Sequence, residues 1–158
     1  MQVWQEILKN NDFIRVKQYL RSGVNPNQTN ENNESVLMLA IQYRCDDEIL
    51  KLLIKNNANL LHKDNYGVNI FDMAIEYNLI WLVRQLVESK LYEPNTTTRG
   101  SGFTPLMCAA SYGRTEILTY LLQEGADKNT EDIKGFKAID FAKKLNKKHI
   151  ISILNHPN

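Results

Sequence analysis

The sequence predicts an all-α fold built from repeated helix pairs, and three observations indicate it. The segment 102–129 carries the start and stop signals of two consecutive helices. Apolar pairs recur along the chain with a similar period. Self-similarity of this kind is the signature of a solenoid, in which each unit buries its apolar face on its neighbours. Alanine also recurs at spacings of 34, 35 and 33 residues, at Ala40, Ala74, Ala109 and Ala142.

Residues 102–129 read GFTPLMCAASYGRTEILTYLLQEGADKN and show the repeated unit most clearly. Thr104 can cap a helix and Pro105 fits its first position, while Gly113 permits the left-handed backbone that ends a helix. A second apolar stripe follows at helical spacing and closes before Gly125. It consists of Ile117, Leu118, Leu121 and Leu122.

This unit resembles an ankyrin repeat, whose consensus runs G-x-T-P-L-H-x-A-A-x-x-G-x-x-E-I-V-x-x-L-L-x-x-G-A-D-x-N. The departures are Met107 for the usual histidine and Arg114 at the next polar position. The resemblance covers nearly the whole chain as about five repeats. It implies antiparallel helix pairs joined by β-hairpin-type loops, a concave binding face, and a role in binding other proteins rather than in catalysis.

The first repeat, residues 1–29, is expected to be an irregular N-terminal cap with helices at 4–9 and 12–20. Trp4 is expected to cover the exposed edge of the core. Four residues of the second helix are expected to point inward: Phe13, Val16, Tyr19 and Leu20.

Four further repeats are expected at 30–63, 64–98, 99–131 and 132–158, so that residues 1–158 form a single domain. Their first helices are predicted to open at Ser35, Asn69, Thr104 and Lys137. Their second helices should bury the apolar pairs Leu53-Ile54, Leu86-Val87, Leu121-Leu122 and Ile153-Leu154. Extra residues around 44–47 and 89–95 should lie in loops, where repeat proteins accommodate insertions.

Composition favours a folded protein in a reducing compartment. Hydrophobic residues make up 43% of the chain and charged residues 23%. Neither an apolar run of membrane-spanning length nor a secretory-type start is present, and Cys45 and Cys108 do not form a disulfide framework. We therefore expect a cytoplasmic monomer that does not bind membranes. The net charge of +1 also argues against a nucleic-acid partner.

Motifs for catalysis, metals and cofactors are missing from the sequence. His62, His149 and His156 have no zinc-type spacing, and phosphate-binding and nucleotide-binding fingerprints are absent. Residues 100–102 form a glycine-rich segment where the repeat places a turn. The acidic residues 46–48 suit a helix start, because the helix dipole favours carboxylates there. We expect no cofactor, no metal and no enzymatic activity.

Aromatic residues recur at the positions that vary among ankyrin repeats, namely the solvent side of the first helix and the hairpin tip. Stacked repeats would align them as a ladder along the concave groove, and tyrosine is over-represented in binding surfaces. Each ring could instead pack only on the preceding hairpin. The predicted partner-binding residues are Gln42, Tyr43, Tyr66, Glu76, Tyr77, Phe103, Ser111, Tyr112 and Phe136.

The last repeat is basic: six lysines and one aspartate lie after residue 132. One interpretation is a polar end cap, because a terminal repeat must face water. The other is an electrostatic docking patch for an acidic partner. The two interpretations are compatible.

The function expected from the resemblance is the binding of a protein partner. The favoured form is a stoichiometric binder or inhibitor of one cytoplasmic protein. The chain is rich in asparagine, as in AT-rich microbes, so a toxin-neutralising immunity protein is one version. The alternative is an adaptor or secreted effector that recruits a host or cellular protein through the same groove.

Overall fold

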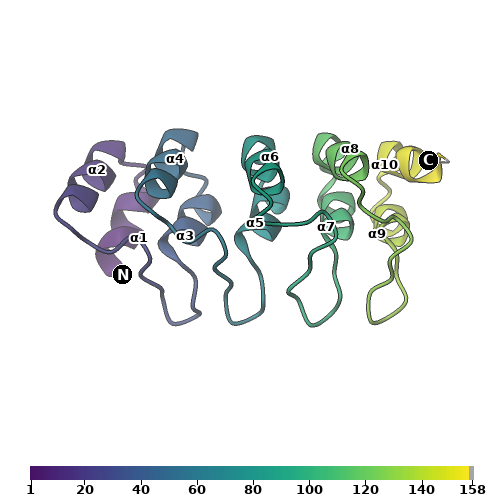
Figure 1. The fold of residues 1–158 in the computed structure, drawn as a ribbon, viewed down its shortest axis with the longest axis horizontal. Helices are drawn as coiled ribbons and strands as arrows, with labels where there is room; N and C mark the ends of the chain where they lie inside the picture. Colours follow the sequence, from purple (N-terminus) through teal and green to yellow (C-terminus); the bar gives the residue numbers. More distant parts are fainter. Residues whose placement is uncertain (157–158) are drawn as a thin grey trace. The chain divides into compact units, whose positions relative to one another are not determined.

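The computed structural model describes residues 1–156, and that range contains ten α-helices (Figure 1). The predicted all-α repeat fold is confirmed. No helix in the described range is long and apolar enough to cross a membrane. The helices are α1 (Gln2–Lys9), α2 (Phe13–Arg21), α3 (Val36–Gln42), α4 (Asp47–Lys55), α5 (Ile70–Glu76), α6 (Ile80–Glu88), α7 (Pro105–Tyr112), α8 (Thr115–Gln123), α9 (Ala138–Lys144) and α10 (Lys148–Asn155).

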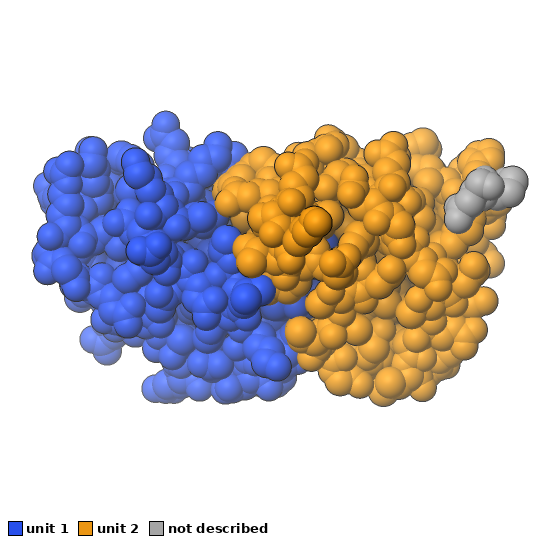
Figure 2. Space-filling view, viewed as in Figure 1, with its two compact units in different colours: residues 1–73 blue, residues 74–158 orange. Residues whose placement is uncertain are grey.

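The chain divides into two compact units, Met1–Met73 and Ala74–Asn158, which Figure 2 shows in blue and orange. Helix α5 runs across the boundary between them. Each of the five predicted repeats contains one consecutive helix pair, from α1–α2 in the first to α9–α10 in the fifth. The single domain over residues 1–158 stays a prediction.

In the first unit, α1 contacts α3 and α2 contacts α4, so first helices stack on first helices and second on second. Every residue from Val36 to Ile41 of α3 is buried, as expected for a helix that is apolar on all sides. Two isolated β-bridges, Thr29–Ser35 and Lys63–Asn69, close the loops before α3 and α5.

The N-terminal repeat differs from its prediction in two respects. Trp4 is 0% exposed, with its ring centroid 4.9 Å from that of Tyr19, so it lies inside the core rather than over its edge. The reason is that Trp4 shares one helical stripe with the buried Ile7 and Leu8. Of the four residues expected inward in α2, Val16 is buried and the other three are half-buried.

In the second unit, α7 contacts α9, and α8 contacts both α6 and α10. Leu86 and Leu121 are buried at the predicted positions of their second helices. In α10 the buried counterpart of Leu121 is Leu154, not Ile153 as the predicted pairing had it. The reason is that α8 and α10 begin 33 residues apart, which brings Leu154 into the register of Leu121.

The start and stop signals of the fourth repeat act as predicted. The Thr104 hydroxyl accepts a hydrogen bond from the Met107 backbone N–H at 3.2 Å, and Pro105 is the first residue of α7. Gly113 ends the helix with φ of 70°, in the left-handed region that glycine enters without steric cost. These contacts fix the end of α7, where Tyr112 lies.

Two asparagine side chains each make the same pair of hydrogen bonds to backbone groups of the following repeat, and we call these contacts the asparagine ties. The Asn27 amide donates to the Asn57 carbonyl at 2.9 Å and accepts from the Asn59 N–H at 2.7 Å. In the second unit, Asn95 makes the same pair of bonds to the Gly125 carbonyl and the Asp127 N–H, at 3.1 and 2.8 Å. Backbone groups of one turn are thus satisfied by the preceding repeat.

Candidate functional site

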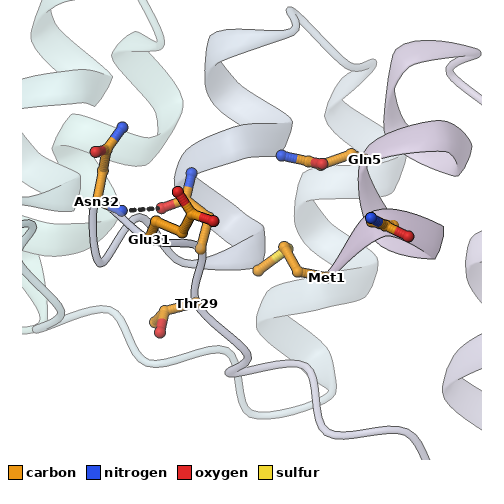
Figure 3. Close-up of a pocket in the computed structure, with 7 residues that line it drawn as sticks. Met1, Gln5, Thr29, Glu31 and Asn32 are labelled. Atoms are coloured by element: carbon orange, nitrogen blue, oxygen red, sulfur yellow. Dashed lines mark hydrogen bonds between the residues drawn. The ribbon is translucent and has the colours of Figure 1, made fainter.

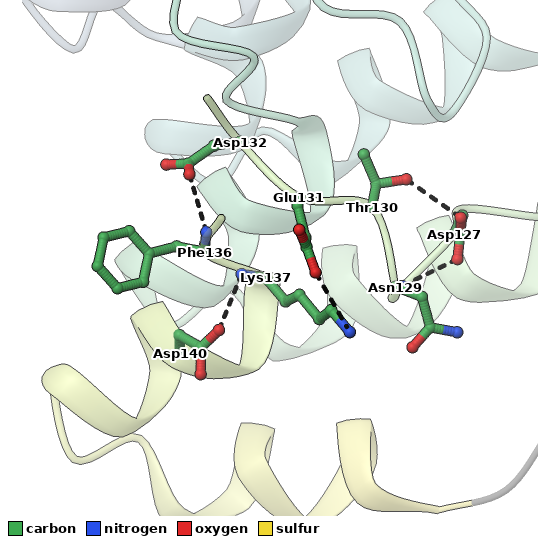
Figure 4. Close-up of polar contacts among 8 residues, drawn as sticks. All are labelled: Asp127, Asn129, Thr130, Glu131, Asp132, Phe136, Lys137 and Asp140. Atoms are coloured by element: carbon green, nitrogen blue, oxygen red, sulfur yellow. Dashed lines mark hydrogen bonds and ion pairs between the residues drawn. The ribbon is translucent and has the colours of Figure 1, made fainter. Parts of the chain in front are cut away.

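In three of the loops that precede first helices, one side chain of the loop holds its own tip. In each loop this residue lies five positions before the residue that precedes the helix (Ser35, Asn69 or Lys137). It accepts hydrogen bonds from two backbone N–H groups, which fixes the turn. Figure 4 shows one of these loops, with Asp132 pointing at the Phe136 backbone. Asn30 accepts from Asn32 and Glu34, Asp64 from Tyr66 and Val68, and Asp132 from Lys134 and Phe136, at 2.8 to 3.0 Å.

The loop before α7 carries Arg99 at the corresponding position, five residues before Thr104. A guanidinium group has no acceptor and cannot hold the tip in this way. It lies instead over the Phe103 ring, with Cζ 5.1 Å from the ring centroid. The Thr97 hydroxyl donates to the Phe103 carbonyl at 2.8 Å. This loop therefore presents a cation next to an aromatic ring.

Phe103 and Phe136, both predicted partner-binding residues, meet through a third ring. The centroid of Phe141 lies 5.2 Å from that of Phe103 and 6.2 Å from that of Phe136, both in edge-to-face arrangements. Phe136 remains 48% exposed. Phe141 was not among the predicted partner-binding residues, because its position inside the first helix of the repeat gives no sign that it joins two loop tips.

Tyr112 and Glu76, two other predicted residues, also lie together. The Tyr112 hydroxyl donates a hydrogen bond to the Glu76 carboxylate, while 42% of the side chain stays exposed. Burial, and then the negative charge and hydrogen bond of Glu76, raise the pKa of Tyr112 to about 12, against the opposing charge of Arg99. The Arg114 guanidinium donates to the Glu76 backbone carbonyl, with Nε 3.0 Å from the oxygen. Neighbouring repeats thereby hold the Tyr112 ring in place.

The remaining predicted residues are distributed over both units. In the first unit Gln42 is exposed, Tyr66 is 76% exposed at its loop tip, and Tyr43 is half-buried with the Lys9 ammonium 5.5 Å from its ring centroid. In the second unit Tyr77 and Ser111 are half-buried. That all nine residues line one continuous groove stays a prediction.

The first unit contains a hollow of about 650 Å³ between α1 and the first loop. Figure 3 shows Met1 and Gln5 on the helix side and Thr29, Glu31 and Asn32 on the loop side. Its lining is mainly amide and hydroxyl groups with one carboxylate, so it can form hydrogen bonds. The lining contains no nucleophile paired with a base.

Titratable groups outside this hollow bear on metal binding and on nucleophilic chemistry, within the part of the chain that the structure describes. Within residues 1–156, no three His, Cys, Asp or Glu side chains gather as metal ligands. Cys45 and Cys108 are both buried free thiols, and the Cys45 thiol donates to the Leu8 carbonyl at 3.2 Å. Burial and the nearby Asp46 raise the pKa of Cys45 to about 11, which keeps it a protonated, unreactive thiol.

Comparison with protein families gives a match over nearly the whole chain. The model described as "Ankyrin repeats (3 copies)" matches residues 6–98 and 81–157.

The chain spans less than a fifth of the length of each of three much longer curated relatives that it matches. Alpha-latrocrustotoxin-Lt1a of Latrodectus tredecimguttatus is 30% identical over 129 residues, which is 80% of this chain and 9% of the relative. Ankyrin repeat and SAM domain-containing protein 6 of Rattus norvegicus is 35% identical over 91 residues, 58% of this chain and 10% of the relative. An ankyrin repeat protein of Fowlpox virus (strain NVSL) is 26% identical over 132 residues, 84% of this chain and 17% of the relative.

Proposed function

This chain belongs to the ankyrin repeat family, and on that premise we propose that it is a stoichiometric binder of one protein partner. Ankyrin repeats are protein–protein interaction modules and are generally not enzymes. The proposed contact surface in the second unit, which we call the aromatic face, consists of Glu76, Phe103, Tyr112 and Phe136.

The proposal rests on one observation: the Tyr112 ring is partly exposed, and contacts with neighbouring residues fix its position. Its hydroxyl is bound by Glu76, and the backbone of Glu76 is bound by Arg114. An exposed aromatic side chain that is already ordered loses little entropy on binding, so the contact energy is retained as affinity. Tyrosine in such a setting is a typical binding hot spot.

The test is affinity capture from extracts of the source cell, with two double variants. Tyr112→Ala with Phe136→Ala removes two rings from the aromatic face. Ile14→Ala with Leu61→Ala is the matched control, since these side chains are 60% and 57% exposed and lie in the first unit. We expect one dominant protein with the natural sequence and with the control. The aromatic-face variant should retain at most about a tenth of it, since two hot-spot truncations cost 2 kcal/mol or more.

Circular dichroism must show unchanged helix content for both variants. Equal capture by the aromatic-face variant, or failure to capture any protein, contradicts the proposal. If a partner is found, its activity in the presence of the purified chain separates an inhibitor, which blocks it, from an adaptor or effector, which does not. A toxin-neutralising role, the cytoplasmic location, the concave groove as the binding site and the monomeric state stay predictions.

A further inference from the structure

A second hollow, of about 220 Å³, lies in the second unit between the connectors of the last two helix pairs. We call it the connector hollow. Tyr112, Gly113 and Thr115 line it from the α7–α8 connection, and residues 147–150 line it from the start of α10. The two sides come from neighbouring repeats, so the site exists only where these repeats stack.

The connector hollow is strongly basic. Lys147, Lys148 and His149 line it, and neither lysine forms an ion pair within residues 1–156. The Lys147 side chain runs along Gly113: its ammonium nitrogen lies 3.3 Å from where a Cβ would stand on that glycine. The exposed Lys143 and Lys144 end α9 nearby in sequence. Two acidic residues lie close by: Glu116, which is exposed and nearest along the lining segments, and Glu76, whose carboxylate is bound to the hydroxyl of the lining residue Tyr112.

Two helix starts and an aromatic ring add to the preference of the connector hollow for an acidic side chain. Thr115 and Lys148 are the first residues of α8 and α10, where the positive end of the helix dipole lies. The Tyr112 ring provides an apolar wall, because its hydroxyl is bound to Glu76. A charged side chain with an apolar neighbour would therefore meet complementary groups.

We propose that the connector hollow binds an aspartate or glutamate side chain from an acidic segment of the protein partner. The inference rests on the proposed function and names the chemistry of the partner. Unpaired lysines around a small concave site favour a carboxylate by charge complementarity and speed its encounter.

A phosphate-bearing ligand is the competing anion at this hollow. Lysine is a point charge that binds carboxylate and phosphate alike, whereas the guanidinium fork of arginine adds bidentate geometry. The lining contains no arginine, and the neighbouring Arg114 is engaged by the Glu76 carbonyl. A long polyanion would also approach Glu116, whereas a short acidic segment need not.

The experiment measures binding of a fluorescent peptide of glutamate and leucine residues by anisotropy, at low and at high salt. The test variant is Lys147→Gln with Lys148→Gln, which keeps much of each side chain and removes the charges. The control, Lys55→Gln with Lys63→Gln, makes the same change in net charge at two exposed lysines of the first unit. We expect the test variant to bind about tenfold more weakly and with less salt dependence, while the control binds as the unmodified chain does.

Three results would overturn the inference: an equal loss in both variants, no binding of the glutamate peptide by the unmodified chain, or tighter binding of a phosphoserine peptide or an oligonucleotide. The outcome is separable from that of the proposed function. A captured partner whose binding depends on Phe136 but is unchanged by the double lysine variant would leave the proposed function intact and remove this inference.

Discussion

The fourth and fifth repeats of the second unit are stabilised in different ways. In the fourth, all residues from Pro105 to Ala110 of α7 are buried and the helix is capped by Thr104. In the fifth, Ala138 and Ala142 are the buried residues of α9, and the Lys137 side chain makes no cap hydrogen bond. The fifth repeat depends more on its loop, where Asp132 holds the tip and Asp140 accepts from the Lys137 N–H at 2.9 Å (Figure 4).

The comparison indicates that a repeat with a well-packed core tolerates a loop side chain that does not stabilise the loop tip. The fourth repeat has a well-filled core, and its loop carries Arg99 where the other loops carry a tip-holding acceptor. Natural proteins often depart from local structural rules at functional sites and compensate elsewhere. Arg99 departs from the pattern of the other loops next to Phe103 of the proposed aromatic face, in the repeat that otherwise follows the consensus best.

The largest expected effect tests the difference between the two cores. Leu121→Ala should lower the free energy of unfolding by ~2–5 kcal/mol, because Leu121 is 0% exposed and its truncation leaves a cavity. Leu154→Ala, in the terminal repeat, should cost less, about 1–3 kcal/mol, because the site can relax toward solvent. Urea unfolding measures both. Equal losses of unfolding free energy in the two variants would contradict the proposed difference between the two cores. A loss under about 1 kcal/mol for Leu121→Ala would contradict the place of Leu121 in the core.

The second effect tests the two loops. Asp132→Ala should lower the free energy of unfolding by about 1–2 kcal/mol, because two backbone N–H groups lose their acceptor. Arg99→Ala should lower it by less than about 1 kcal/mol, since it removes a cation–π contact of a half-buried side chain but no acceptor for the loop-tip N–H groups.

Two further variants sharpen the loop comparison. Asp132→Asn keeps the acceptor oxygen, so it should lose much less than Asp132→Ala. Arg99→Asp installs the missing acceptor and should stabilise the chain by about 0.5–1 kcal/mol, the usual net value of one hydrogen bond. Urea unfolding that showed Arg99→Asp to be destabilising would mean that the fourth loop is shaped by another contact.

The smallest effect concerns the ionisation of Tyr112. Its pKa is raised to about 12, first by burial and then by Glu76, so Glu76→Gln should move it down toward the ordinary value of about 10. A raised pKa means that the neutral form is favoured in the folded state. The stabilisation is therefore complete below about pH 10 and is lost as the pH rises toward 12.

NMR of carbon-labelled tyrosine measures this titration, and Tyr112→Phe assigns the signal. A pKa of Tyr112 that did not change in Glu76→Gln would mean that burial alone raises it and that Glu76 does not hold the ring.

Much of the fold could be predicted because its signals are local. Thr104, Pro105 and Gly113 act within one helix, and the four recurring alanines are all buried in first helices. The register of Leu154 was missed by one residue, because Ile153 and Leu154 are both apolar and either could be paired with Leu121; the 33-residue spacing of Ala109 and Ala142 gives the observed register.

The candidate site could be predicted only in part. Tyr112, Glu76, Phe103 and Phe136 were selected from their positions in the repeat, and the structure shows which of them meet. It adds Phe141, the contact of Arg114 with the Glu76 carbonyl, and the substitution of Arg99 for a tip-holding acceptor. Most of these contacts join residues about one repeat apart, and a single sequence gives no local signal for them.

The asparagine ties have a consequence for how the molecule opens. The amide hydrogens of Asn59 and Asp127 are bound by side chains of the preceding repeat rather than by their own. Their exchange with deuterated solvent therefore requires a neighbour to loosen, not merely the turn in which they lie. Hydrogen exchange at these two amides therefore reports the local opening of the preceding repeat, in a class of protein whose stability depends on contacts between neighbouring repeats.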